Sequence, residues 1–323
     1  MSEYYLVDIS KELVSEPIRK GFGRGLLAAG KLDERVVAAC ADLTDSTQMG
    51  LFRAEFPERF VEVGVAEQNL VTVGAGLAAG GKIPFVSSYA AFSPGRNWEQ
   101  IRTTICLNDR PVKVVGSHAG ISVGPDGATH QMLEDIALMR VLPNMVVIVP
   151  GDSVEAEKAT LAMARDGRPN YLRLAREATP IFTTAKTPFK IGPAYVYEQG
   201  VDVTIIATGA MTYQALKAAV LLYKDGIEAE IIHVPTIKPL DSATILKSVR
   251  KTKCVVTAEE GQIIGGLGGA IAELLAENCP AHLKRIGMKD RFGESGEPAE
   301  LYTHFGLDAE HIRLAAHEVT AKK

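Results

Sequence analysis

Residues 59–81 read RFVEVGVAEQNLVTVGAGLAAGG, in which a short apolar run leads directly into a longer helical pattern. The run at 60–65 predicts a buried strand, and the residues from about Ala66 onward predict a helix. This strand–helix step is the repeating unit of open, parallel α/β sheets. It also places Glu67 in the first helical turn at the carboxyl end of a strand, where such sheets bind ligands.

The same alternation continues along the chain in both directions. Apolar runs that do not alternate with polar residues are typical of parallel strands covered on both faces. These runs are RVVAACAD (35–42), IPFVSS (83–88), VKVVGSH (112–118), MVVIVP (145–150), NYLRLA (170–175), VTIIAT (203–208), AEIIHV (229–234), KCVVTAEE (253–260) and HLKRIG (282–287). Between them, patterns such as 153–167 and 210–226 repeat apolar residues at helical spacing and end at glycine, which predicts helices.

One stretch interrupts the alternation. It reads TTAKTPFKIGP, ends at Pro193, and has prolines, threonines and lysines but little periodicity. A length of 323 residues is also more than one core usually fills. We therefore predict two consecutive open, mostly parallel α/β sheets. The first domain would span residues 1–183, the linker residues 184–193 and the second domain residues 194–323.

Composition and charge exclude several classes of partner. The chain has 35 Lys plus Arg against 39 Asp plus Glu, a formal net charge of −4. It therefore lacks the basic excess that nucleic acid or an anionic membrane surface requires. No apolar run approaches the roughly 18 residues of a membrane-spanning helix. The four cysteines show no CxxC spacing, which predicts reduced thiols and a cytoplasmic location.

The loop GSHAGISVGPDGATHQMLED, residues 116–135, is the richest in chemistry. It follows a buried-type strand and holds His118, Asp126 and His130 among several glycines. Two imidazoles and a carboxylate suit hydrogen bonding to hydroxyl groups and proton transfer near neutral pH. Zinc binding is the competing interpretation, but the spacing matches no usual zinc pattern and no cysteine is near. We therefore predict no metal ligands in this chain.

Other candidate residues also allow a purely structural interpretation. An acid in a first helical turn, such as Glu67, favours the helix dipole. Tyr89 and Phe92 in FVSSYAAF could fill a core as readily as they could stack on a flat heterocycle. Arg19 in EPIRKG and Arg176 in LRLARE could grip a phosphate or simply lie in solvent. On residue type alone, both interpretations stay open.

A glycine-rich stretch near the end of the chain, AEEGQIIGGLGGAIAELLAE, occupies residues 258–277. It passes from a predicted strand through a turn into a predicted helix. Its spacing differs from the G-x-G-x-x-G fingerprint of dinucleotide-binding proteins. We therefore interpret it as a structural turn with close packing of helix on sheet.

Taken together and in order, the motifs resemble the C-terminal half of transketolase. They are IRKGFGRG, ACADLTDST, RFVEVGVAEQN, FVSSYAAF, SHAGISVGPDGATHQMLED and LRLARE, and the resemblance covers nearly the whole chain. It implies a pyrimidine-binding α/β domain followed by a transketolase C-terminal α/β domain. It also implies the family's activity, which is transfer of a two-carbon glycolaldehyde unit from a ketose phosphate to an aldose phosphate.

The sequence departs from full-length family members in one respect. They carry a GDG…N motif that holds Mg²⁺ and the diphosphate of thiamine diphosphate, and no such motif occurs in these 323 residues. The chain therefore resembles the second subunit of a split transketolase. The resemblance implies a separate N-terminal subunit that binds Mg²⁺ (or Ca²⁺), and an assembly that is a dimer or a heterotetramer.

The resemblance also implies roles for single residues at the cofactor. Glu67 matches the glutamate that hydrogen-bonds the aminopyrimidine of thiamine diphosphate and thereby promotes loss of a proton from the thiazolium carbon. Tyr89 and Phe92 match the aromatic residues that pack against the pyrimidine. Asp42, in the motif ACADLTDST, matches an acid near the thiazolium ring.

For the substrate, the resemblance implies two groups of contacts. Residues that match contacts to the sugar phosphate are Ser46, Arg19 and Arg176. Residues that match groups binding the ketose hydroxyls and moving protons are His118, Asp126 and His130.

The sequence also allows three alternative functions. A split carboligase similar to 1-deoxyxylulose-5-phosphate synthase shares the loop of residues 116–135, which we call the histidine loop. The β subunit of a 2-oxoacid dehydrogenase shares the two-domain layout but usually lacks the pair of His118 and His130. A non-catalytic nucleotide-binding or scaffold protein could use the GGLGG turn, but it would leave Glu67 and the histidine loop without a role.

Overall fold

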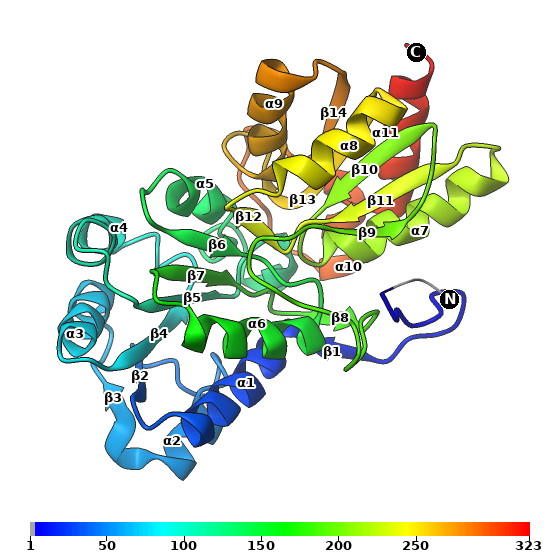
Figure 1. The fold of residues 1–323 in the computed structure, drawn as a ribbon. Coiled ribbons are helices and arrows are strands. Elements are labelled where there is room, and N and C mark those ends of the chain that lie inside the picture. The colour runs from blue at the N-terminus through cyan, green and yellow to red at the C-terminus, as the bar shows by residue number, and fades with distance from the viewer. Residues whose placement is uncertain (1–3) are drawn as a thin grey trace.

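The computed structural model describes residues 4–323, so residues 1–3 of the predicted first domain lie outside it. Two α/β units lie side by side, one coloured blue to green and the other yellow-green to red (Figure 1). Each is built on an open sheet in which most neighbouring strands are parallel. The predicted fold class is therefore confirmed.

The first unit contains a seven-stranded sheet in the order β12-β6-β7-β5-β4-β2-β3. All neighbours are parallel except β12, which pairs with β6 in the antiparallel direction. The strands are β2 (Val36–Cys40), β3 (Phe60–Glu62), β4 (Ile83–Tyr89), β5 (Lys113–Ser117), β6 (Val146–Ile148), β7 (Asn170–Arg173) and β12 (Thr236–Lys238).

Helices cover both faces of this sheet, and most residues of its strands are therefore buried. The adjacent residues Val114 and Val115 on β5 point to opposite faces and belong to different core clusters. Val115 packs with α1 (Ile18–Leu32), α2 (Gly50–Glu55) and α6 (Ser153–Arg165). Val114 packs with α3 (Glu67–Ala79), the π-helix η2 (Ile101–Cys106) that continues α4 (Trp98–Gln100), and α5 (Asp135–Arg140).

The second unit contains a five-stranded sheet in the order β14-β13-β10-β11-β9. Its parallel strands are β10 (Val203–Ala207), β11 (Ala229–His233), β13 (Cys254–Gln262) and β14 (His282–Met288), and β9 (Tyr195–Glu198) is antiparallel to β11. Its helices are α7 (Met211–Lys224), α8 (Ser242–Thr252), α9 (Leu267–Asn278), α10 (Pro298–Phe305) and α11 (Ala309–Thr320).

The two units share buried surface. One core cluster contains Val86 and Val114 of the first sheet together with Ile206 and Val255 of the second. Strand β12 also crosses from the second half of the chain to the edge of the first sheet. Residues 184–193 contain no helix or strand. The division at that linker nevertheless stays a prediction, because the core and β12 continue across it.

Every predicted apolar run forms a strand, but within residues 59–81 the ends of the strand and the helix differ from the prediction. The run at 60–65 is a strand only over Phe60–Glu62. Gly64 then turns the chain with a φ of +70°, and the amide of Ala66 bonds its carbonyl at 2.7 Å. Helix α3 begins at Glu67, one residue later than predicted.

The sequence patterns also missed four short strands. They are β9, β12 and the antiparallel pair of β1 (Ser15–Pro17) with β8 (Ala178–Pro180). Three of them have only three residues, which is too short for a periodic pattern to be distinguished from a loop.

Candidate active site

Polar side chains meet at the carboxyl ends of neighbouring strands of the first sheet. Strands β7, β5, β4, β2 and β3 lie next to one another in that order. The residues that follow or end these strands are Arg176, His118, Tyr89, Asp42 and Glu67. Because the strands are parallel, all five residues lie at one edge of the sheet, where open α/β sheets bind ligands.

Glu67 is a buried acid at this edge, with only 1% of its surface exposed. Its Oε2 accepts a hydrogen bond from Nη1 of Arg96 at 2.7 Å, and its main-chain oxygen accepts one from Nδ2 of Asn97 at 2.8 Å. A buried carboxylate is costly unless it is paired or hydrogen-bonded. The site therefore holds an acid away from water, with its ion-pair partner Arg96 half-exposed at 51%.

Aromatic rings lie beside this acid. The rings of Tyr89 and Phe92 are stacked, with centroids 6.1 Å apart and planes 18° apart. The guanidinium of Arg96 lies 4.9 Å from the centroid of Phe92. Both rings are half-buried, so they are neither ordinary core residues nor free in solvent. They offer apolar faces next to a hydrogen-bonding acid.

His118 is buried and stacks on Tyr89, with ring centroids 3.8 Å apart. Its Nδ1 lies 2.9 Å from Oγ of Ser117. Burial, followed by the charges of Arg19 and Arg176 and by His130, lowers the pKa of His118 to about 3. The imidazole is therefore neutral at physiological pH, with one nitrogen that donates and one that accepts.

His130 completes the group from the far end of the same loop. Its ring meets Phe92 edge-on at 5.4 Å and Tyr89 at 6.3 Å, and its Nδ1 lies 2.9 Å from Oγ1 of Thr129. The structure thus brings both predicted histidines to the aromatic pair.

Arg19 and Arg176 lie next to each other. Nη1 of Arg19, in the first turn of α1, donates to the main-chain oxygen of Arg176 at 2.6 Å. Nη1 of Arg176 donates to the main-chain oxygen of Val123 at 2.6 Å, which ties it to the histidine loop. Burial and the adjacent Arg176 lower the pKa of Arg19 below its usual value, and its Nε is buried without a hydrogen bond. Two adjacent cations of this kind attract an anion.

Three predicted site residues have side chains that make no polar contact within the described residues. Asp42 is exposed with a φ of +59°, and its amide donates to Oε1 of Glu62 at 2.7 Å. Ser46 lies in the turn that follows, and Asp126 is exposed at the end of the short helix η3 (Ile121–Asp126). Within residues 4–323, the side chains of Asp42, Ser46 and Asp126 form no hydrogen bond or ion pair.

The sequence patterns missed Arg96 and Asn97, which contact Glu67 directly. Asn97 is completely buried and also donates to Oγ of Ser93 at 3.1 Å. The only signal was their place in SPGRNW, immediately after the aromatic residues. That position alone does not reveal that the loop folds back onto the first turn of α3.

The GGLGG turn is structural, as the sequence indicated. The buried carboxylate of Glu259 accepts hydrogen bonds from the amides of Leu267 and Gly268 at 2.8 and 2.7 Å. It therefore occupies the N-terminus of α9, where a nucleotide phosphate would otherwise bind. Burial raises the pKa of Glu259 to about 7. This internal carboxylate argues against a dinucleotide site at the turn.

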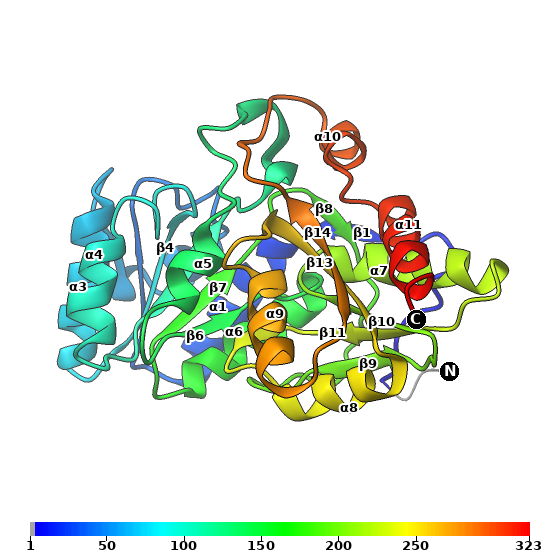
Figure 2. The same ribbon diagram turned by 90° about the horizontal axis from the view of Figure 1, so that it is seen from above.

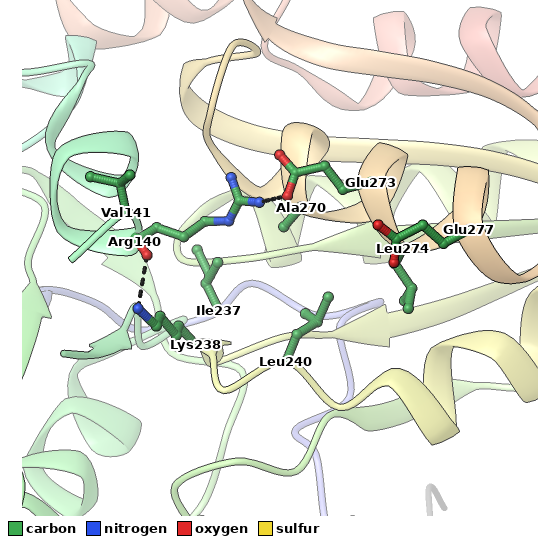
Figure 3. Close-up of a pocket in the computed structure, with 9 residues that line it drawn as sticks. All are labelled: Arg140, Val141, Ile237, Lys238, Leu240, Ala270, Glu273, Leu274 and Glu277. Atoms are coloured by element: carbon green, nitrogen blue, oxygen red, sulfur yellow. Dashed lines mark hydrogen bonds and ion pairs between the residues drawn. The ribbon is translucent and has the colours of Figure 1, made fainter. Parts of the chain in front are cut away.

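A cleft of about 530 Å³ opens at the junction of the two units (Figure 3). Arg140 pairs with Glu273 and donates to the carbonyl of Gly265, while Lys238 donates to the carbonyls of Arg140 and Leu142. Its lining residues, none of them a predicted site residue, are Arg140, Val141, Ile237, Lys238, Leu240, Ala270, Glu273, Leu274 and Glu277. Its charged groups join the units, and the cleft is separate from the Glu67 site.

Membrane-spanning helices and clusters of metal-binding side chains are both absent from the described part of the chain. Over residues 4–323, no helix has both the length and the apolar character needed to cross a membrane. The same residues contain no group of three or more His, Cys, Asp or Glu side chains that could hold a metal ion.

The structure is that of an α/β protein with two successive units. A buried acid, stacked aromatic rings and two histidines lie at the strand ends of the first unit and form a candidate ligand site. Family patterns identify the chain further. The pattern described as the transketolase pyrimidine binding domain matches residues 16–181, and that of the transketolase C-terminal domain matches residues 192–312. The chain belongs to the transketolase family.

Individual relatives agree with this assignment. The chain is 47% identical over 302 residues to a putative transketolase C-terminal section of Methanocaldococcus jannaschii, covering 93% of this chain and 95% of that relative. It is 44% identical over 299 residues to the 6-deoxy-6-sulfo-D-fructose transketolase subunit SqwH of a Clostridium species, covering 92% of each. A solved structure described as a split gene transketolase, inactive beta4 tetramer, superposes with a TM-score of 0.89 at 42% identity, covering 94% of this chain and 98% of that one.

Proposed function

We propose that this chain is the C-terminal subunit of a split, thiamine-diphosphate-dependent transketolase. Together with a separate N-terminal subunit, it would transfer a two-carbon glycolaldehyde unit from a ketose phosphate to an aldose phosphate. The observation that carries the proposal is the buried acid Glu67 beside the stacked rings of Tyr89 and Phe92. The relatives support it, since one is named a C-terminal section and another a subunit.

The residues at the site fit the cofactor that the family uses. A flat aminopyrimidine needs apolar ring faces and a hydrogen-bonding acid that water does not reach. Tyr89 and Phe92 supply the faces, and Glu67, 1% exposed, supplies the acid. When bound, thiamine diphosphate supplies a nucleophilic carbon that can accept the two-carbon unit.

The residues of this chain would then act on protons at defined atoms. The carboxyl group of Glu67 would hold or share a proton with a ring nitrogen of the pyrimidine. Arg96, which now bonds that carboxyl, is half-exposed and can turn into solvent. His118 is neutral, so its ring can accept or donate a hydrogen bond at a sugar hydroxyl. We assign the same task to His130.

The remaining site residues are proposed from their places on the sheet edge. The adjacent guanidinium groups of Arg19 and Arg176 would bind the sugar phosphate, with Ser46 as a further contact. We place Asp42 near the thiazolium ring and Asp126 at the ketose hydroxyls.

We propose that the partner subunit carries the GDG…N motif and holds the diphosphate with Mg²⁺ or Ca²⁺. The assembly would be a dimer or heterotetramer of the two kinds of chain. The similar structure described as an inactive beta4 tetramer supports a need for a second kind of subunit. The cysteines Cys40, Cys106, Cys254 and Cys279 are free, and all but Cys279 are buried, which supports a cytoplasmic location.

The identity of the donor tests this function. We expect the reconstituted enzyme to move label from a ketose phosphate with ¹³C at C1 and C2 into a ketose that is two carbons longer than the aldose acceptor. NMR of the products would follow the label. Pyruvate as the working donor, with release of CO₂, would assign the reaction of 1-deoxyxylulose-5-phosphate synthase instead. The same assay without an acceptor is the control.

Replacement of Arg176 tests the phosphate contact. We expect Arg176→Ala to raise KM for a phosphorylated donor by about 10- to 100-fold, because a charge-assisted hydrogen bond is lost. KM for the unphosphorylated sugar should change by less than about twofold. Arg176→Ala also removes the hydrogen bond to Val123, but that loss would change KM for both sugars alike. The ratio of the two KM values therefore reports the contact with the phosphate. Arg250→Ala, on the exposed end of α8, is the matched control. Equal effects on both sugars would contradict the contact.

A further inference from the structure

The loop that carries His118 and His130 lies between the first sheet and the second unit. In Figure 2 the green loop after β5 stands beside the orange segment that leads to α10. Nε2 of Gln131, the residue after His130, donates to the main-chain oxygen of Glu294 at 2.8 Å. A Cβ atom at Gly127 would lie 2.4 Å from Oγ of Ser295. The second unit is therefore in direct contact with the loop.

One acid of the second unit reaches the start of this loop. Glu260, on β13, is only 3% exposed, and its Oε1 accepts a hydrogen bond from the amide of Ser122 at 2.7 Å. The same oxygen lies against Gly120, where a Cβ atom would come within 2.2 Å of it. Gly120 has a φ of +90°, so this turn combines a close approach with a glycine conformation. The Glu260 carboxylate therefore supports the turn two residues after His118.

Further hydrogen bonds hold Glu260 itself in place. Nη2 of Arg173, on β7 of the first sheet, donates to the main-chain oxygen of Glu260 at 2.6 Å. Nε of Arg173 bonds Oδ2 of Asp135 at 3.0 Å, and the hydroxyl of Tyr171 donates to the same oxygen at 2.7 Å. Burial raises the pKa of Glu260, while Arg173 and the hydrogen bonds of Ser122 and Tyr302 lower it. The network fixes β13 against the first sheet, so the carboxylate has little freedom to move.

We propose that Glu260 is a positioning residue through which the second unit sets the placement of His118. It acts on the amide of Ser122 and the backbone of Gly120, and it does not contact substrate. With that turn fixed, the ring of His118 stays stacked on Tyr89 and presents its free nitrogen to a sugar hydroxyl. The effect on catalysis rests on the proposed function, whereas the support of the loop does not.

The neighbouring residue offers a matched control. Glu259 is also a fully buried carboxylate on β13, but it accepts its hydrogen bonds from Leu267 and Gly268 within the second unit. Loss of either carboxylate disturbs the same strand. Only loss of the Glu260 carboxylate removes a contact to the histidine loop.

The test uses Glu260→Leu, which keeps bulk without an acceptor, Glu260→Gln, which keeps an acceptor without charge, and Glu259→Gln. Hydrogen–deuterium exchange is measured on the full chain over residues 119–126, and kcat and cofactor binding on the enzyme reconstituted with its partner subunit. For Glu260→Leu we expect loop exchange to rise by about tenfold. We expect kcat to fall by about 10- to 100-fold while cofactor affinity stays within about twofold, because Glu67 and Tyr89 lie outside the loop.

The conservative variant and the control separate positioning from stability. Glu260→Gln should raise loop exchange by about fivefold and keep most of kcat, since a neutral hydrogen bond replaces a charge-assisted one. Glu259→Gln should speed exchange at Leu267 and Gly268, not in the loop, with kcat within about twofold of wild type. If Glu260→Leu does not fold, the Gln variant decides the question.

Two results would overturn the proposal: unchanged loop exchange in the Glu260 variants, or an equal loss of kcat in Glu259→Gln. The two proposals can also fail separately. If the wild-type assembly transfers no two-carbon unit, the proposed function is refuted. Faster loop exchange in Glu260→Leu would still support the contact between Glu260 and the loop.

Discussion

Glu67→Gln is expected to lower kcat of the reconstituted enzyme by on the order of 10² to 10⁴, the usual contribution of a positioned acid–base group. The amide has nearly the same shape and can still accept a hydrogen bond from Arg96. The contact with Asn97 uses the main chain and is unaffected. What the amide cannot do is hold and release a proton, so the loss should fall on the chemical step.

Two further measurements make this result specific. Trp98 is the single tryptophan of the chain and follows Asn97, so its fluorescence can report cofactor binding next to Glu67. We expect cofactor binding and the unfolding midpoint of Glu67→Gln to stay close to wild type. Glu58→Gln, at an exposed position before β3, is the control and should retain full turnover. Near-normal turnover in Glu67→Gln would remove this residue from the mechanism.

The location of the site was predictable because parallel sheets place all their carboxyl ends on one edge. The apolar run before Glu67, the strand before Tyr89 and the strand before His118 are each visible in the sequence. Strand order then makes β3, β2, β4, β5 and β7 neighbours. Residue type and strand position together therefore bring these side chains to one place, and the family resemblance gives them roles.

The contacts that tune the site were not predictable in this way. Glu260 ends an apolar run that reads only as a strand, and its partner Ser122 lies 138 positions away. That contact depends on how two separate sheets pack, which no local pattern encodes. Arg96 is similar, since its ion pair with Glu67 depends on the path of a loop. Sequence patterns predict which sheet edge carries the candidate site, while long-range packing determines which residues support it.

The isolated chain is expected to show no turnover above the uncatalysed reaction, even with thiamine diphosphate and Mg²⁺ at saturating concentrations. Its site is open to solvent on one side: Val65, two residues before Glu67, is 71% exposed, and Arg96 is 51% exposed. Helix α3 likewise presents Gly76, where a Cβ would meet no atom within 4 Å apart from its chain neighbours and the nearby backbone of its own helix. Reactive carbon nucleophiles need water to be excluded, and this chain alone does not close the site.

Addition of the N-terminal subunit should restore turnover, with activity rising until the two kinds of chain are equimolar. Glu67→Gln supplies the decisive control, because it should bind the partner normally but form inactive sites. Mixed with wild-type chain at limiting partner, it should lower activity in proportion to its share of the mixture. If the isolated chain is inactive and the mixture loses activity in this proportion, then the partner must complete a site that contains Glu67. Turnover by the isolated chain would instead place the whole catalytic centre within these residues and refute the split-subunit proposal.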